Sequence, residues 1–229
     1  TYLQHCQYRG VDGVVIACVD FDDPQVLELV NSKLPVVTID HVFNNRAAVV
    51  SDNVRGMEEL VRYVYAKGHR RIAFIHGEQT AVTENRLTGF YRACDALELE
   101  IPDAYIREGV YHDPDRCAEL TRELLRLPEP PTCILMPDDF SSIGGRNAIH
   151  RMDLRLPEDI SVAGYDGIQI ASVMSPALTT YRQDTQALGR TAAAKLIELI
   201  EKPRTALVDR VLIPGHLVEG ASVRAIETL

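Results

Sequence analysis

The sequence of 229 residues contains no tryptophan, and aromatic residues make up only 6% of it. It also lacks any run of about 18 apolar residues, which argues against a membrane-spanning helix. The N-terminal residues do not show the charged and apolar regions of a secretory signal peptide. We therefore expect a cytoplasmic protein that makes no contact with a membrane.

Basic residues are also scarce. The chain has 24 Lys and Arg against 33 Asp and Glu, which gives a net charge of −9. A surface that binds duplex DNA needs clustered Lys and Arg to neutralise phosphates. The densest basic group is only His69-Arg70-Arg71. We predict that this segment on its own does not bind nucleic acid tightly.

The patterns of metal, disulfide and catalytic chemistry are missing too. The five cysteines are odd in number, never spaced as CxxC and set in apolar stretches, which is typical of reduced core thiols. The seven histidines form no pair at metal-ligand spacing. No GxGxxG, Walker loop, GxSxG or HExxH motif occurs. We expect no enzymatic activity, no metal and no cofactor.

Short apolar runs alternate along the chain with segments of helical periodicity. Residues 13–19 form a continuous apolar run, which is typical of a buried strand, and residues 53–68 carry apolar side chains at helical spacing. Strands that alternate with helices indicate parallel sheets covered on both faces. The alternation of predicted strands and helices continues long enough to form two lobes. The predicted class is therefore α/β, with two doubly wound parallel-sheet lobes.

Polar side chains follow several of the predicted strands. Asp40, Asp138, Asp139 and Asp166 each come directly after an apolar run, and Arg86 begins a predicted helix beside the sheet edge. Each aspartate could simply cap a helix by accepting hydrogen bonds from free backbone amides. Because ligands bind at the carboxyl ends of strands in such sheets, the carboxylates and the guanidinium together also suit a polar ligand.

An aromatic side chain would complete such a site by packing against a ring face of the ligand. Tyr111, which follows a predicted strand in the segment REGVYHD, is the candidate. The alternative for Tyr111 is ordinary packing in the core or at its rim.

Six motifs in order along the chain resemble the lactose/galactose repressor (LacI/GalR) family of bacterial transcription regulators. Any one of them would be weak, but six at suitable spacing over nearly the entire chain are highly specific. The motifs are VDGVVI (residues 11–16), SDNVRG (51–56), GHRRIAFI (68–75), RLTGF (86–90), LPEDISVAGYDG (156–167) and SPALTTYRQD (175–184).

The resemblance implies a periplasmic-binding-protein-like type I fold, with two lobes joined by a hinge of three crossovers. It places residues 1–67 and 178–202 in an N-terminal lobe, and residues 68–177 and 203–229 in a C-terminal lobe. Members of the family bind a sugar or a nucleobase-like effector between the lobes and form homodimers. They contact operator DNA through a helix-turn-helix head, which the family places before residue 1.

The resemblance also implies roles for individual residues. Arg86 matches the arginine that grips the effector, Asp166 matches a carboxylate that contacts it, and Tyr111 matches an aromatic that packs against it. Asp138 stands where the family often has Asn, which removes a donor and adds a charge. Asp40 is a looser match to an effector contact.

Two other classes of protein share parts of this pattern. A periplasmic sugar-binding protein of a transporter has the same fold and cleft, but SPALTTYRQD resembles the regulators more than the transporters. A nucleotide-dependent enzyme would need a phosphate-binding glycine loop, which is missing. We therefore expect the effector-sensing and dimerisation domain of a transcription regulator, with a sugar as the favoured effector.

Overall fold

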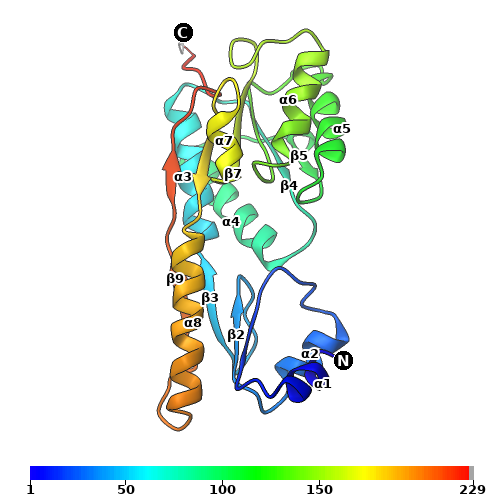
Figure 1. Cartoon of the computed structure of the whole chain (residues 1–229). Coiled ribbons are helices and arrows are strands. Elements are labelled where there is room, and N and C mark those ends of the chain that lie inside the picture. Colours follow the sequence, from blue (N-terminus) through cyan, green and yellow to red (C-terminus); the bar gives the residue numbers. More distant parts are fainter. Residues whose placement is uncertain (227–229) are drawn as a thin grey trace. The chain divides into compact units, whose positions relative to one another are not determined.

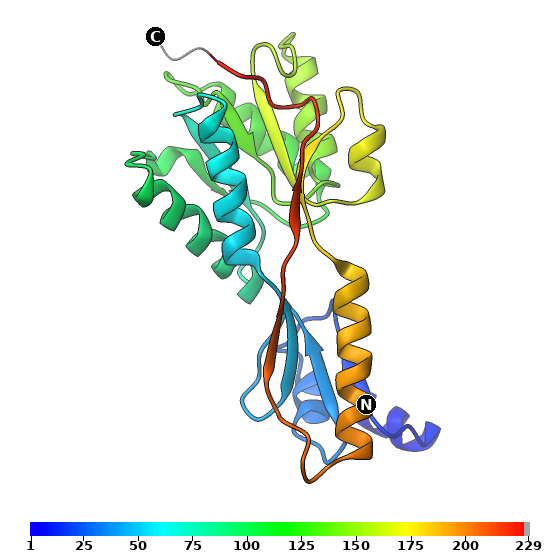
Figure 2. The same ribbon diagram turned by 90° about the vertical axis from the view of Figure 1, so that its left-hand side faces the viewer.

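The computed structural model describes residues 1–226 and contains two compact units (Figures 1 and 2). Unit 1 consists of Thr1–Asp52 and Asp184–Pro214, and unit 2 consists of Asn53–Gln183 and the chain from Gly215 onward. The chain therefore passes between the units three times. The predicted α/β class, with two sheet-containing units and three crossovers, is confirmed.

Unit 1 is built on a parallel sheet with strand order β1-β2-β3-β9. Helix α2 covers one face through Val26, Leu29 and Val30, and helix α8 covers the other through Leu188 and Ala192. The elements are α1 (Tyr2–Arg9), β1 (Val14–Ile16), α2 (Pro24–Val30), β2 (Val36–Ile39), β3 (Ala47–Ser51), α8 (Thr185–Glu201) and β9 (Arg210–Ile213).

Unit 2 is built on a sheet with strand order β10-β8-β7-β6-β4-β5, in which only β10 runs antiparallel to its neighbour. The strands are β4 (Ile72–His76), β5 (Ile106–Glu108), β6 (Cys133–Leu135), β7 (Ser161–Asp166), β8 (Thr179–Arg182) and β10 (His216–Val218). The helices are α3 (Asn53–Ala66), α4 (Ala81–Ala96), the short 3-10 helix η1 (Asp103–Tyr105), α5 (Pro114–Leu125), α6 (Ser142–Arg151) and α7 (Gln169–Val173).

Helices cover both faces of the unit 2 sheet. On one face, Met57 and Leu60 of α3 and Phe90 of α4 pack on β4, β6, β7 and β8. On the other face, Leu120 of α5 and Ile149 of α6 pack on the alternate side chains of the same sheet. Each buried strand therefore contributes side chains to two cores, which explains its continuous apolar run. None of the helices within residues 1–226 is long and apolar enough to cross a membrane.

Two helix starts in unit 2 are fixed by side-chain caps. Asp113 caps α5 by accepting from the Arg116 amide, and Pro114 occupies the first helical position. Helix α4 was expected to begin at Arg86 but begins at Ala81, because Thr80 provides its cap. Arg86 therefore lies in the second turn of α4.

The division into units differs from the boundaries expected from the sequence, which put residues 53–67 with unit 1 and residues 203–214 with unit 2. Helix α3 packs against α4 and contacts β8 and β10, so it belongs to unit 2. Strand β9 pairs with β3 over four residues, so it belongs to unit 1. Strand β8 pairs with β7 and stays in unit 2 as far as Gln183.

The cysteines only partly match the expectation of core thiols. Cys94, Cys117 and Cys133 are buried free thiols, as predicted. Burial raises the pKa of Cys94 and of Cys117 to about 12, so neither forms a thiolate at neutral pH. The expectation is wrong for Cys18, which is exposed in the loop after β1.

The GHRR segment joins α3 to β4 through a buried histidine. Gly68 ends the helix with φ of +96°, and a Cβ atom there would overlap the carbonyl oxygen of Ile226. The His69 ring is fully buried, with Nδ1 2.9 Å from Thr132 Oγ1 and Nε2 3.1 Å from the Arg224 carbonyl oxygen. Burial lowers the pKa of His69 to about 4.

Acidification should therefore destabilise the fold through His69. The unfolded chain takes up this proton near pH 6.5 and the folded chain only near pH 4, so stability is lost as the pH falls through that window. We expect a loss of about 2 kcal/mol in the free energy of unfolding. Urea unfolding at pH 7 and pH 4.5 should show that His69→Asn loses less unfolding free energy between the two pH values than the wild type does. The exposed-site variant His150→Asn should lose as much as the wild type. An equal loss in all three proteins would show that His69 is not the group responsible.

Candidate functional site

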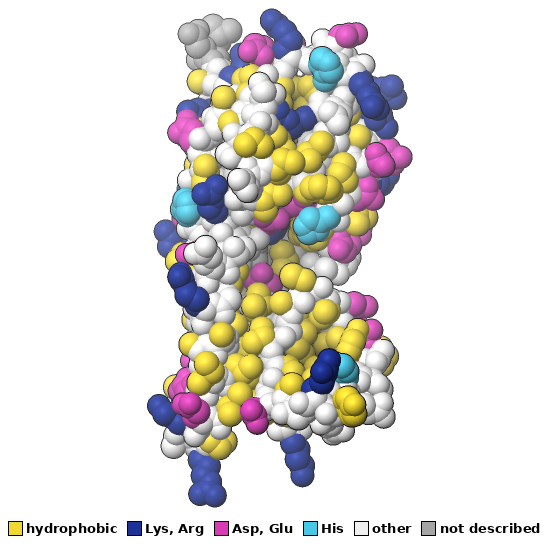
Figure 3. Space-filling model, in the orientation of Figure 1, with side chains coloured by type: hydrophobic (Ala, Val, Ile, Leu, Met, Phe, Trp, Pro, Cys, Tyr) yellow, Lys and Arg dark blue, Asp and Glu magenta, His cyan; other side chains and the backbone are white. Residues whose placement is uncertain are grey.

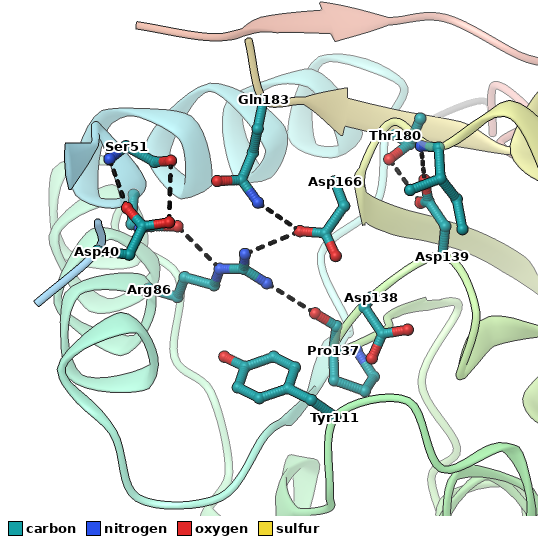
Figure 4. Close-up of polar contacts among 12 residues, drawn as sticks. Asp40, Ser51, Arg86, Tyr111, Pro137, Asp138, Asp139, Asp166, Thr180 and Gln183 are labelled. Atoms are coloured by element: carbon teal, nitrogen blue, oxygen red, sulfur yellow. Dashed lines mark hydrogen bonds and ion pairs between the residues drawn. The ribbon is translucent and has the colours of Figure 1, made fainter. Parts of the chain in front are cut away.

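Arg86 lies at the centre of a polar cluster at the carboxyl edge of the unit 2 sheet (Figure 4). Its side chain is buried, yet each of its nitrogen atoms has a protein acceptor. Nε donates to Asn53 Oδ1 at 3.0 Å, Nη1 to the Pro137 carbonyl at 2.8 Å and Nη2 to Asp166 Oδ1 at 3.0 Å. The cluster thus joins the start of α3, the end of β6 and the end of β7 through one side chain.

The guanidinium of Arg86 also lies against aromatic rings. Its central carbon is 3.7 Å from the ring centroid of Tyr165 and 5.4 Å from that of Tyr111. Burial alone lowers the pKa of Arg86, but the two tyrosines and Asp166 outweigh it and raise the pKa overall. Arg86 is therefore a fixed positive charge with its plane set by hydrogen bonds and by a ring face.

Asp166 is the last residue of β7 and has a φ of +99°. Its Oδ1 atom accepts from Arg86 and from Gln183 Nε2, the latter at 2.6 Å, and its side chain is 20% exposed. Within residues 1–226, its Oδ2 atom has no hydrogen-bond partner. Asp166 therefore presents one open acceptor oxygen, whose orientation is fixed by the bonds that its other oxygen makes.

Tyr111 follows β5, and its half-buried ring lies over the backbone of Gly77, where a Cβ atom would overlap the ring. Its hydroxyl is 2.9 Å from Thr83 Oγ1 of α4. Burial raises the pKa of Tyr111, so the phenol stays neutral at physiological pH. The structure therefore brings Tyr111 together with Arg86 and Asp166, as the sequence predicted.

Asp138 takes a different place from the one expected. Its carboxylate is buried and accepts from the Ser141 amide at 2.7 Å, from Ser141 Oγ at 2.7 Å and from the His112 amide at 3.0 Å. Asp138 therefore ties the loop after β6 to the loop after β5, rather than presenting a free carboxylate to a ligand.

The loop that carries Tyr111 is held by three successive backbone amides. Tyr111 donates to Glu78 Oε2 at 2.8 Å, His112 donates to Asp138, and Asp113 donates to Ser141 Oγ at 3.1 Å. The acceptors come from the loops that follow β4 and β6. We define these three bonds as the loop clamp, and it fixes the backbone on which the Tyr111 ring is mounted.

The Asp138→Asn variant should loosen the loop clamp. The Ser141 and His112 amides bind different oxygens of Asp138, and Asn replaces one of these oxygens with an NH₂ donor, so the variant cannot accept from both amides without rearranging. We expect hydrogen exchange at the His112 amide to rise at least about tenfold while the fold is retained. Exchange mass spectrometry or NMR can measure this, with the exposed acid Asp115→Asn as the control. Unchanged exchange at His112 would show that Asp138 does not hold the loop.

Asp139 and Asp40 are tied into the framework in other ways. The buried Asp139 accepts from Thr180 Oγ1 at 2.6 Å and from the Ile168 amide at 2.8 Å, so its carboxylate does not cap α6. Burial raises the pKa of Asp139 to about 7 against the effect of those bonds. Asp40 lies in unit 1, where it accepts from the Ser51 amide at 2.6 Å and connects β2 to β3.

Sequence reasoning missed several members of the cluster. Asn53, Gln183 and Tyr165 were seen only as parts of motifs. The one available signal was position, since Gln183 directly follows β8 and Tyr165 directly precedes Asp166. No sequence pattern indicated that their side chains meet at Arg86.

Basic side chains do not gather on the face shown in Figure 3. There, Lys and Arg are separated from one another by polar and apolar surface rather than joined in one continuous patch. This face therefore presents no continuous basic patch.

Comparison with known proteins identifies the family. The periplasmic binding protein-like domain family matches residues 61–223. The HTH-type transcriptional repressor PurR of Escherichia coli is 30% identical over 97% of this chain and 68% of PurR. The transcriptional regulator CelR in complex with cellobiose has a TM-score of 0.83 at 28% identity, covering 97% of this chain and 71% of CelR.

A second solved structure gives the same result. A LacI family regulator from Enterococcus faecalis V583 with bound ribose has a TM-score of 0.84 at 25% identity, covering 99% of this chain and 82% of that protein. The order of motifs, the two sheet-containing units and these relatives agree. The chain belongs to the LacI/GalR family of transcription regulators and contains its periplasmic-binding-protein-like domain.

Proposed function

We propose that the Arg86–Asp166 cluster is the site at which this regulator recognises a small hydroxyl-bearing effector, a sugar. The observation that carries the proposal is the open Oδ2 atom of Asp166, whose carboxylate is held by the hydrogen bonds of Arg86 and Gln183. The Tyr111 ring lies 5.4 Å from the central carbon of the same Arg86. The family consists of regulators rather than enzymes, so binding itself is the expected activity. The sugars bound by CelR and by the Enterococcus faecalis regulator support this class of effector.

The chemistry of the cluster suits a sugar. A carboxylate oxygen accepts hydrogen bonds from hydroxyls, and a guanidinium has five N–H donors, of which three are used here within the protein. Two donors of Arg86 therefore remain for ligand oxygens. The face of Tyr111 offers packing for the C–H side of a sugar ring. The N–H donors of Arg86 and the acceptor oxygen of Asp166 thus match the hydroxyls of a sugar, and the face of Tyr111 matches its C–H groups.

The regulatory consequence follows from linkage. An effector shifts a conformational equilibrium only by its difference in affinity for the two states, so binding at unit 2 has to favour one arrangement of the protein. As in the family, we propose that a homodimer transmits this preference to helix-turn-helix heads on operator DNA in the cytoplasm. The transporter alternative is not favoured, because the relatives reported above are transcription regulators.

Thermal unfolding with a panel of neutral sugars tests the proposed site. D-ribose, D-glucose and cellobiose at about 10 mM are the probes, and we expect at least one to raise Tm by several degrees. The Asp166→Asn variant replaces an acceptor oxygen with a donor and should lose this response. Asp159→Asn, at an exposed pair with Arg155, should keep it. An equal response from Asp166→Asn would contradict the placement of the site.

A further inference from the structure

We infer that the effector carries no negative charge, so that the site takes a free sugar and rejects its phosphorylated or carboxylated derivatives. The inference rests on the proposed function and narrows its ligand class. It depends on three features of the described residues: the balance of charge, the commitments of the basic side chains, and the occupation of the helix N-termini.

Acidic side chains outnumber basic ones at the carboxyl edge of the unit 2 sheet. This edge has two arginines, Arg86 and Arg182, whereas the loops after β4 and β6 and the end of β7 provide the acids Glu78, Asp138, Asp139 and Asp166. An anion that enters this edge meets a net negative set of charges. Exposed pairs are screened by salt, but buried carboxylates such as Asp138 are screened far less.

Arg86 cannot offer an uncompensated fork to an anion. The charge of Arg86 is matched by Asp166 at 3.0 Å, and each of its nitrogens already has a protein acceptor. Arg182 donates through Nε to the Gly167 carbonyl at 3.1 Å. Recognition of phosphate or carboxylate relies on paired N–H donors of an uncompensated Arg, and this edge holds the guanidinium of Arg86 compensated.

Helix N-termini are the other common binding sites for phosphate. Here carboxylates of the chain already occupy those that follow β5 and β6. Asp113 accepts from the Arg116 amide at the start of α5, and Asp138 accepts from the Ser141 amide at the start of α6. The start of α4 is closed by Thr80, which accepts from the Thr83 amide at 3.2 Å. A ligand phosphate would have to displace a covalently attached acceptor at each helix.

Unit 1, taken on its own, also has acidic side chains in excess at the carboxyl edge of its sheet. The loop after β1 contributes Asp20, Asp22 and Asp23, and Asp40 and Asp52 follow β2 and β3. Residues 17–23, 40–45 and 52 contain no Lys or Arg. At these edges Arg86 is compensated, Arg182 has no carboxylate partner among the described residues, and the acidic side chains outnumber both arginines.

Matched pairs of ligands test the inference directly. We would titrate the protein with D-ribose and D-ribose 5-phosphate, and with D-glucose and D-glucose 6-phosphate, by calorimetry at low and moderate salt. The phosphorylated member should bind at least about tenfold more weakly, because two charges within a few ångströms of a carboxylate repel strongly at the effective dielectric constant of such a site. Added salt should weaken this penalty and leave the affinity for the free sugar unchanged.

A charge variant makes the test independent of which sugar fits best. Glu78→Gln removes one acid from the loop after β4. It should reduce the ratio of the affinities for the free and the phosphorylated sugar of a pair several-fold. Glu129 is an exposed acid before β6 at the opposite edge of the sheet, so Glu129→Gln should leave the ratio of the two affinities unchanged. Equal or tighter binding of a phosphorylated member would overturn the inference while leaving the proposed sensing function intact. No binding by any of the four ligands would overturn the proposed sugar site and the inference with it.

Discussion

Replacing Arg86 with alanine should abolish effector binding and also destabilise unit 2. The side chain holds three acceptors at once, and its loss leaves the carboxylate of Asp166, the amide of Asn53 and the Pro137 carbonyl without their shared donor. Breaking a buried ion pair by removing one partner typically costs about 3–5 kcal/mol. Because Asp166 is 20% exposed, we expect about 2–3 kcal/mol here. Urea unfolding measures the stability, and calorimetry with the best free sugar measures the binding.

Two further variants separate binding from folding. Arg86→Lys keeps the charge but not the three-way geometry, so it should fold and still bind at least about tenfold more weakly. Arg155→Ala removes an exposed arginine paired with Asp159 and should leave both the free energy of unfolding and the binding nearly unchanged. Wild-type affinity in Arg86→Lys would mean that the fixed orientation of the guanidinium is unimportant, which contradicts the site described above.

The meeting of the candidate site residues could be predicted from the sequence because topology determines it. In a parallel sheet every strand ends at the same edge, so polar residues after successive strands have to meet there. Arg86, Tyr111 and Asp166 are brought together for this reason, although Arg86 comes from the second turn of α4. The helix start was misplaced because Thr80 and its bond to the Thr83 amide give a weak signal in the sequence.

The roles of the aspartates could not be predicted in the same way. Asp138 was expected to face a ligand, but its partners are the amides of His112 and Ser141. Backbone donors are present at every position, so no motif identifies which of them a buried carboxylate will bind. Only the three-dimensional approach of neighbouring loops distinguishes Asp138, which holds a loop, from Asp166, which offers an open oxygen. The unit boundaries escaped prediction for a related reason, because the packing of α3 on α4 leaves no local signal.

The Gly144→Ala variant should be strongly destabilising because α5 and α6 approach each other through this residue. A Cβ atom on Gly144 would overlap both the carbonyl oxygen and the carbonyl carbon of Pro114. Both atoms are backbone at the first turn of α5, so no side chain can rotate to relieve the overlap. The helices have to separate, and we expect a loss of about 3 kcal/mol in the free energy of unfolding. Calorimetry should show Tm lowered by roughly 6–12 °C.

Gly189→Ala is the matched control, since a Cβ atom at Gly189 has no neighbour within 4 Å. In the exposed interior of α8, alanine should raise stability by up to about 1 kcal/mol, because it loses less backbone entropy on folding than glycine. The two substitutions add the same methyl group to a helix, so only packing distinguishes them. Gly144→Ala should also weaken effector binding, because Pro114 directly follows the loop clamp through which Tyr111 is positioned. Similar stability for the two variants would show that α5 and α6 can separate at little cost, and the loop clamp would then not depend on their close approach.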